Sequence, residues 1–104
     1  LSFGTVQGLA EAQYYLGEMF YMGEGVSQDY AQALKWFRKA AEQGFAHAQI
    51  YLGGMYDRGE DVTQDYAEAV KWYRKAAANG DEDTQFLGET KEMLKEAEAK
   101  VALG

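Results

Sequence analysis

The chain carries few side chains of the types that catalyse reactions or bind transition metals. Among its 104 residues there are one histidine, His47, two serines, Ser2 and Ser27, and no cysteine. A hydrolytic centre needs a nucleophile beside a base, and neither serine is followed three residues later by a lysine. A zinc-type centre needs several imidazole or thiolate ligands, and His47 has no second one. The sequence therefore predicts no catalytic residues, no metal site and no cofactor.

An acidic stretch between residues 57 and 68 places side chains at ligand positions of a calcium-binding loop; they are Asp57, Asp61, Thr63, Asp65 and Glu68. Gly59, however, stands at another ligand position, and Val62 stands where such a loop needs a glycine for its sharp turn. The matching stretch earlier in the chain, residues 21–32, has few carboxylates. We therefore interpret this stretch as a connection between helices.

Composition and charge narrow the class of protein further. Apolar residues make up 47% of the chain and charged residues 26%, which is typical of a folded globular domain. Ten Lys and Arg against 17 Asp and Glu give a net charge of −7, whereas a nucleic-acid binder needs a basic face. No apolar run reaches the length of a membrane span. Nucleic acid and membrane insertion are therefore excluded as first hypotheses.

A repeat of 36 residues organises the chain. Residues 8–43 aligned with residues 44–79 are identical at 22 of 36 positions, and a third, shortened copy starts at Gly80. We interpret residues 1–7 as the remnant of an upstream repeat or a tail. Residues 8–43 and 44–79 are the first and second repeats, and residues 80–104 are a partial third repeat or a capping helix.

Each repeat contains two stretches with helical periodicity, which we expect at 10–22 and 30–43 and again at 46–58 and 66–79. In the first stretch Ala12, Leu16 and Met19 are spaced to lie on one helix face, together with Phe20. The second stretch carries a wide apolar stripe made of Ala33, Trp36, Phe37, Ala40 and Ala41. Two amphipathic helices per repeat predict antiparallel helix pairs.

Residues that suit helix ends stand at the expected borders. Asp29 followed by Gln32, and Asp65 followed by Glu68, predict N-caps with a reciprocal partner three residues on. Glycines follow all four stretches, where a left-handed residue ends a helix; they are Gly23, Gly44, Gly59 and Gly80.

Glycine also stands inside the first helix of each repeat, at Gly17 and Gly53. Because a helix-interior glycine costs about 1 kcal/mol relative to alanine, its recurrence predicts a close approach of two backbones. Trp36 and Trp72 are expected to fill the gaps between successive helix pairs. Stacked pairs of this kind form an α-solenoid.

These residues identify a resemblance to the Sel1-like repeat (SLR) family, relatives of the tetratricopeptide repeat. The marks in the first copy are Ala12, Leu16, Gly17, Phe20, Gly23, Gly25, Val26, Asp29, Ala33, Trp36, Ala40, Ala41 and Gly44. The second copy carries Ala48, Leu52, Gly53, Tyr56, Gly59, Val62, Asp65, Ala69, Trp72, Ala76, Ala77 and Gly80. The resemblance covers residues 8–80 and implies an all-α superhelix of antiparallel helix pairs.

Two departures from the family pattern affect the expected structure. Asp61 replaces the second loop glycine, so the loop needs Asp in the left-handed region. In the third copy Leu87 and Gly88 come one residue early, and no tryptophan follows. The C-terminal helix has a thin apolar seam made of Leu87, Leu94, Ala97 and Val101. We expect it to cap the stack, with a dimerisation seam or a seat for a further repeat as alternatives.

The resemblance implies a protein-interaction scaffold or adaptor, of a kind frequent in bacteria, without catalysis of its own. The alternative from the same family is a cell-envelope hydrolase acting on β-lactams or peptidoglycan, but the cysteine-rich pattern of those relatives is missing. A third alternative is a structural fragment that binds nothing alone. With two full repeats we expect a monomer or a weak homodimer. The compartment stays open between periplasm, secretion and cytoplasm.

In tetratricopeptide repeats one side of each first helix lines a concave face. Transferred to this chain, that side predicts a partner-binding face of Glu11, Tyr14, Glu18, Tyr21, Met22, His47, Ile50, Asp57, Arg58, Gln85 and Glu89. Aromatic and methionine anchors bordered by charge suit a peptide groove. The surplus of carboxylates favours a protein or peptide partner of basic or neutral charge.

Overall fold

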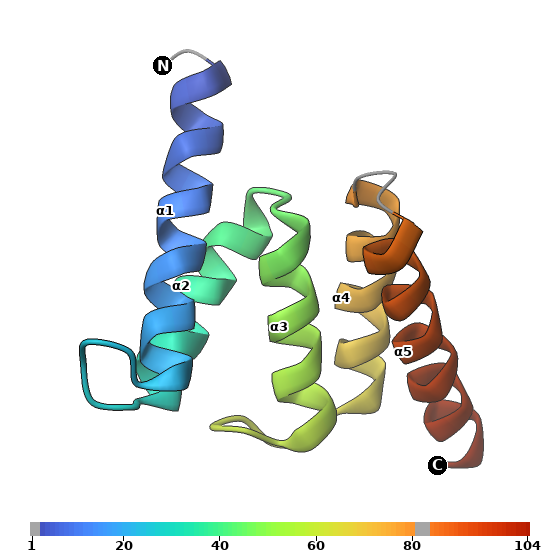
Figure 1. The fold of residues 1–104 in the computed structure, drawn as a ribbon. Helices are drawn as coiled ribbons and strands as arrows, with labels where there is room; N and C mark the ends of the chain where they lie inside the picture. Colours follow the sequence, from blue (N-terminus) through green and yellow to red (C-terminus); the bar gives the residue numbers. More distant parts are fainter. Residues whose placement is uncertain (1–2, 81–83) are drawn as a thin grey trace.

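The computed structural model describes residues 3–80 and 84–104, with side chains from 8–80 and 88–104 (Figure 1). This part of the chain forms five α-helices and no strand: α1 (Phe3–Met22), α2 (Tyr30–Glu42), α3 (Ala46–Arg58), α4 (Tyr66–Asn79) and α5 (Thr84–Leu103). Each helix packs against the next one in the chain, and successive helices run in opposite directions (Figure 1). The predicted all-α fold of antiparallel helix pairs is confirmed.

The predicted N-caps form, but only one of the two hydrogen bonds of each capping pair is present. The Asp29 carboxylate accepts a hydrogen bond of 3.1 Å from the backbone N–H of Gln32, and Asp65 does the same for Glu68. The backbone N–H of Asp29 does not take the reciprocal bond, because it donates to the carbonyl of Phe20 at 2.9 Å. Each loop is thus fastened back onto the helix before it, which fixes the angle between the two helices of a pair.

Three of the four predicted left-handed glycines are confirmed and one prediction is wrong. Gly23, Gly44 and Gly59 have φ values of +73°, +90° and +70°. Gly80 is extended, with φ −71° and ψ 151°, so α4 ends without a left-handed turn. Asp61 has φ +59°, as the missing loop glycine requires.

The glycines inside α1 and α3 lie where a neighbouring helix comes close. A Cβ atom at Gly17 would stand 2.6 Å from the ring of Phe37, and one at Gly53 would stand 2.8 Å from the ring of Tyr73. These rings belong to α2 and α4. The recurring glycine therefore receives an aromatic ring of its partner helix, and the predicted close approach is confirmed.

The apolar stripe of the first helix is covered in the second repeat only. In α3 the stripe residues Ala48, Leu52 and Met55 are fully buried in a core that α2 helps to build. In α1 the equivalent Leu16 and Met19 are each 37% exposed, and Ala12 is exposed. The expectation that this stripe is the packing face of α1 is therefore wrong: α1 packs through Ala10, Tyr14 and Gly17. No described helix precedes α1 to cover the stripe.

The register predicted for the third copy is also wrong. Gly88 is exposed, and no described helix follows α5 to place a ring against it as α4 does against Gly53. The side chain of Leu87 lies outside the described residues. Instead α5 packs on α4 through Thr90 and Ala97, which are fully buried, and half-buried Leu94.

Polar contacts show the register that α5 adopts. Thr90, Leu94 and Ala97 have the spacing of Ala48, Leu52 and Met55, 42 residues later in the chain. The Arg74–Glu98 ion pair of 2.7 Å accordingly takes the place of the Arg38–Tyr56 hydrogen bond. Relative to the Leu87–Gly88 alignment, α5 is displaced by seven residues, which is about two helical turns.

Candidate functional site

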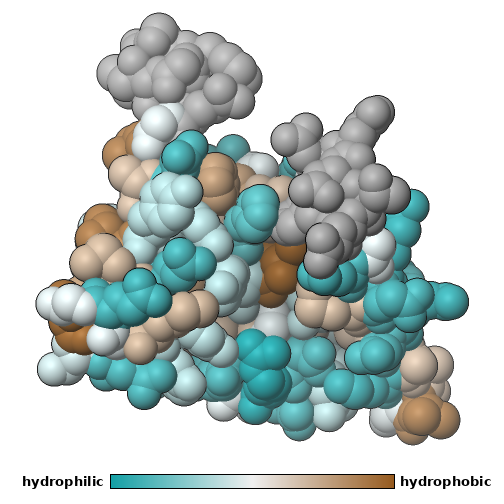
Figure 2. All heavy atoms as spheres, viewed as in Figure 1, coloured by the Kyte–Doolittle hydropathy of each residue, from teal (hydrophilic) through white to brown (hydrophobic). Residues whose placement is uncertain are grey.

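The first helices of the repeats share one side of the molecule. In Figure 1 α1, α3 and α5 run in the same direction, each joined to a neighbour of opposite direction. Figure 2, in the same view, shows an apolar spot recessed near the centre of the molecule, with polar residues around it. We call the side formed by α1, α3 and α5 the first-helix face.

An aromatic layer, made of Tyr14, Tyr21, Phe37 and Tyr51, joins α1, α2 and α3 beneath this face. The rings of Phe37 and Tyr51 stack with centroids 4.7 Å apart, and Tyr21 meets Tyr51 edge-on at 5.5 Å. Tyr14 lies 5.8 Å from Tyr51. Because aromatic pairs at such distances add to the energy of burial, the layer holds α1 and α3 at a fixed separation.

The hydroxyls of this layer meet carboxylates. Tyr14 donates to Glu18 at 2.9 Å, and Tyr51 donates to the same carboxylate oxygen at 3.3 Å. Tyr21 donates to Glu60 at 2.8 Å. Two carboxylates are therefore held in place by phenols at the edge of the aromatic layer.

The two carboxylates differ in their charge balance. Arg58 reaches Glu60 at 3.1 Å and also donates to the hydroxyl of Tyr21 at 3.1 Å. Glu18, in contrast, forms no ion pair with any residue that the structure describes. A half-buried carboxylate without a cation attracts a positively charged group more strongly than one in bulk water does.

Burial raises the pKa of Tyr14, Tyr21 and Tyr51 above its ordinary value, and the neighbouring carboxylates raise it further. All three phenols are therefore protonated at neutral pH and act as hydrogen-bond donors. A protonated phenol is neither a base nor an activated nucleophile. Their protons are donated in hydrogen bonds to the carboxylates of Glu18 and Glu60.

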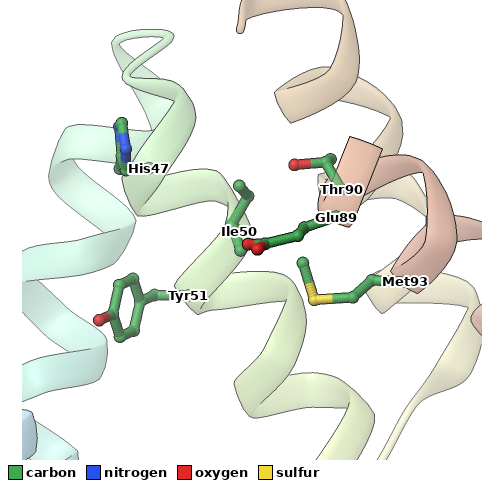
Figure 3. Close-up of a pocket in the computed structure, with 6 residues that line it drawn as sticks. All are labelled: His47, Ile50, Tyr51, Glu89, Thr90 and Met93. Carbon is green, nitrogen blue, oxygen red and sulfur yellow. The ribbon is translucent and has the colours of Figure 1, made fainter. Parts of the chain in front are cut away.

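A pocket of about 260 Å³ opens between α3 and α5 (Figure 3). Its lining residues are His47, Ile50, Tyr51, Glu89, Thr90 and Met93. Ile50 and Met93 supply apolar surface, and the side chain of Glu89 extends towards Ile50 (Figure 3). The pocket combines apolar walls with a carboxylate, so it suits a side chain that has an apolar stem and a polar or cationic end.

The structure brings most of the predicted partner-binding residues to this face but gives them different roles. Tyr14 is buried at its floor; Glu18, Tyr21, Ile50 and Asp57 are half-buried; Glu11, Met22, His47, Arg58 and Glu89 are exposed. In the described part of the chain, Glu11 and Met22 form no hydrogen bond or ion pair with the aromatic layer. The side chain of Gln85 lies outside the described residues.

Asp57 serves the contact between helices. Its carboxylate pairs with Lys100 of α5 at 3.1 Å and accepts a hydrogen bond from Tyr73 of α4 at 3.4 Å. The Asp57–Lys100 pair joins α3 to α5 at the same repeat position at which the Tyr21–Arg58 hydrogen bond joins α1 to α3. The Asp57 carboxylate is therefore already bound by side chains of α4 and α5.

Sequence reasoning missed four residues of this region: Tyr51, Glu60, Thr90 and Met93. Tyr51 and Glu60 recur in both repeats, with Tyr15 and Glu24 at the equivalent positions, so repetition could have pointed to them. Met93 aligns with Met22 and Arg58 of the predicted face, so the repeat could have pointed to it as well, whereas Thr90 aligns with Met55 of the buried stripe and could not have been found in this way.

The described residues carry neither a metal-binding cluster nor a membrane-spanning helix. No group of three or more His, Asp or Glu side chains there is arranged to hold a metal ion. None of the helices in that part of the chain is long and apolar enough to cross a bilayer.

Solved structures of similar chains share this architecture. A Sel1 repeat protein from Oxalobacter formigenes is 44% identical with a TM-score of 0.68, covering 72% of this chain and 31% of its own. The protective antigen c5321 of uropathogenic Escherichia coli, which displays an SLR fold, is 52% identical with a TM-score of 0.68. That match covers 72% of this chain and 16% of the antigen. This chain thus spans less than a third of either neighbour. No curated protein matches closely enough to count as a relative.

The Sel1 repeat family matches the chain twice in tandem, over residues 10–45 and 46–81. Sel1 repeats are generally protein-interaction modules, and their fold is typically a non-catalytic scaffold. The first matched segment covers α1 from residue 10 together with α2, and the second contains α3 and α4. The chain belongs to the Sel1 repeat family.

Proposed function

We propose that this chain is a scaffold module whose first-helix face binds a basic or neutral segment of a partner protein. The observation that carries the proposal is Glu18, a carboxylate oriented by two phenols and without an ion pair among the described residues; one of these phenols, Tyr51, also lines the pocket between α3 and α5. An anchored carboxylate next to an apolar recess is the complement of a lysine or arginine beside an apolar residue.

The pocket has the size of a side-chain site. Small-molecule sites enclose about 300–1,000 Å³, whereas this pocket encloses about 260 Å³ and is open to solvent. Ile50 and Met93 are suited to one apolar or long aliphatic side chain, and Glu89 to its cationic end. Such an anchor would carry much of the affinity of a weak, extended peptide.

The alternative of a cell-envelope hydrolase has no support from the described residues. The phenols on the first-helix face are protonated donors, because burial and adjacent carboxylates raise the pKa of each. His47 lies on the rim of the pocket, where its neighbours include the ring of Tyr14 at 5.8 Å. We therefore keep interaction as the proposed function.

Selection of a random peptide library on the immobilised chain tests this proposal. The selected peptides are expected to share a lysine or arginine next to an apolar residue. Their affinity, measured by fluorescence anisotropy, is expected to fall about tenfold or more for Glu89→Lys, which reverses charge in the pocket, and for Met93→Trp, which fills it.

The matched control is Glu42→Lys, the same charge reversal at an exposed position of α2 outside the face. It should leave the affinity unchanged, and all variants must keep the helical circular dichroism of the parent chain. Selected peptides that lack basic residues, or that lose affinity equally for Glu89→Lys and Glu42→Lys, would contradict the proposal.

A further inference from the structure

The second helices of the two repeats are positively charged, although the net charge of the chain is −7. Six of its ten Lys and Arg side chains belong to α2 and α4, and each of these helices carries three of them against a single carboxylate. In contrast, α1 carries two carboxylates and no Lys or Arg. Positive charge is therefore concentrated on the second helices.

Four lysines make up the exposed part of this positive charge. They are Lys35 and Lys39 of α2 and, at the equivalent positions of α4, Lys71 and Lys75. Helical spacing puts each pair on the side of its helix opposite to the buried stripe, so the ammonium groups face solvent. We call the surface of these four lysines the second-helix face.

A tryptophan holds each pair of lysines. The Nζ atoms of Lys35 and Lys39 lie 5.4 and 4.9 Å from the centroid of the Trp36 ring. In the second repeat the corresponding distances to the Trp72 ring are 5.3 and 5.0 Å. Because an indole ring attracts ammonium groups, it restricts the lysine side chains. Side chains that are already restricted lose less conformational entropy on binding.

Carboxylates compensate little of this charge. Lys35, Lys39 and Lys75 form no ion pair with any residue that the structure describes, and Lys71 reaches Glu68 at 3.7 Å. Like charges four residues apart repel each other on a helix, yet the pair occurs in both repeats. An anionic group close to both ammonium groups of a pair would offset this repulsion.

The two lysine pairs belong to one surface, because their helices share a core. Trp72 of α4 is 4% exposed and lies in the same core as Ala40 and Ala41 of α2. Lys71 and Lys75, which lie over the Trp72 ring, are therefore held at the border between α4 and α2.

We propose that the second-helix face binds an acidic segment of a second partner protein, whose carboxylates pair with the ammonium groups of both repeats. None of its four lysines lines the pocket or bonds Glu18, so this surface is separate from the one in the proposed function. Together the two surfaces would let the chain join a basic segment on one side to an acidic segment on the other.

Charge favours a short acidic segment over other anionic partners. Screening by salt limits the field of exposed charges to about 8 Å at physiological ionic strength, so a short segment responds to the nearby lysines. A long nucleic acid, an anionic bilayer or a second copy of the chain also meets the net charge of −7, which repels it.

Fluorescence anisotropy with a labelled oligoglutamate peptide tests the proposal. Lys35→Glu combined with Lys39→Glu should weaken binding about tenfold or more, and Lys71→Glu combined with Lys75→Glu should do the same. The affinity of the parent chain should fall as the salt concentration rises.

The matched control is Lys91→Glu combined with Lys95→Glu. These lysines are an exposed pair of the same spacing on α5, a helix that has no tryptophan and carries four glutamates. The control changes the net charge of the chain by the same amount and should leave the affinity within about twofold.

A pair of single charge reversals separates this proposal from the proposed function. Glu42→Lys removes the only carboxylate of α2, so it should raise the affinity for oligoglutamate about threefold or more and leave the affinity for basic peptides unchanged. Glu89→Lys, in the pocket, should lower the affinity for basic peptides and leave that for oligoglutamate within about twofold. The oligoglutamate results hold whether or not basic peptides bind.

All variants must keep the helical circular dichroism of the parent chain. Lys35→Gln combined with Lys39→Gln, which keeps the helix propensity, replaces the charge reversal where that unfolds α2 and should still weaken binding.

Four results would overturn the proposal. The parent chain could fail to bind oligoglutamate, or the α5 control could weaken binding as much as the α2 and α4 variants. A short DNA duplex or vesicles containing phosphatidylserine could bind more tightly than oligoglutamate and with the same dependence on Lys35 and Lys39, in which case the face binds phosphate groups. The parent chain could also sediment as an oligomer that Lys35→Glu combined with Lys39→Glu dissociates, in which case a second copy occupies the face.

Discussion

At the scale of single residues, the tyrosines of the first-helix face combine two tasks. Tyr14 and Tyr21 were expected as partner contacts, and the structure uses their rings to join α1 to its neighbours. Their hydroxyls orient Glu18 and Glu60. Removing either ring would therefore disturb packing together with binding, so the exposed Glu89 is the better position for a binding test.

Alkaline pH should destabilise the protein through these phenols. The pKa of Tyr14, Tyr21, Tyr51 and Tyr73 is raised in the folded state, first by burial, above the value of about 10 in an unfolded chain. Below pH 10 both states keep the proton, so the contribution is fully present. Above pH 10 the unfolded state loses protons first, so the free energy of unfolding falls, by up to about 1.4 kcal/mol per pH unit for each phenol.

Urea denaturation at about pH 8 and about pH 11 measures this loss. Tyr14→Phe should lose less stability between the two pH values than the parent chain, because one titrating phenol is gone. Tyr15→Phe, which removes an exposed hydroxyl, is the control. Equal losses in the parent and Tyr14→Phe would contradict the assignment of the effect to buried phenols.

At the scale of helices, equivalent glycines turn out to have different surroundings. Gly53 receives the ring of Tyr73, whereas Gly88 faces open space. The repeat alignment placed both at the same position of a first helix. The difference arises because the ring that meets Gly53 comes from the following helix, α4, and no described helix follows α5 to meet Gly88.

Alanine at these two glycines should therefore have opposite effects. Gly88→Ala should raise the free energy of unfolding by up to about 1 kcal/mol, since it removes the backbone entropy of a helical glycine. Gly53→Ala should lower it by about 1–3 kcal/mol, since the added methyl group collides with a buried ring. Urea denaturation monitored by circular dichroism measures both, and a loss at both positions would show that Gly88 has a packing role.

The displacement of α5 preserves the side that faces the site. Seven residues are about two turns, so a helix moved by that distance presents nearly the same side. Glu89 therefore stays on the first-helix face although the register behind its prediction is wrong. An error of one residue would have turned its side chain by about 100°.

At the scale of the whole molecule, the stack is held chiefly by contacts between consecutive helices, and side-chain contacts also join α1 to α3 and α3 to α5. Each helix packs on the next in the chain, and α5 covers Ala69, Val70 and Tyr73 of α4. A linear stack of this kind loses its end units before its centre. The C-terminal helix thus covers one side of α4, while Leu16 and Met19 of α1 at the other end have no cover among the described helices.

A charged side chain introduced into the contact between α4 and α5 should detach α5 while the other helices stay folded. Ala97→Glu places a carboxylate at a fully buried position, and hydrogen exchange should lose amide protection across α5 while α2 and α3 keep theirs. Ala99→Glu, at an exposed position of the same helix, is the control. Equal loss of protection in all five helices would contradict local release of the cap.

The sequence by itself determined the helices, most of their borders and their pairing, although α1 begins at Phe3 and not at the expected residue 10. The repeat of 36 residues, the caps at Asp29 and Asp65 and the internal glycines encode these locally, because capping and periodicity depend on residues a few positions apart. Membership of the Sel1 family followed from the same marks.

Only the tertiary structure decided which apolar stripe is covered and where α5 sits. Leu16 and Leu52 have the same sequence surroundings, yet one is partly exposed and the other buried, because burial depends on whether a helix precedes the pair. The contacts of Glu18 with two phenols from different helices, and the pocket beside them, likewise arise from packing between repeats. Side chains that are far apart in the sequence come into contact only when the repeats stack, so local periodicity cannot predict these contacts.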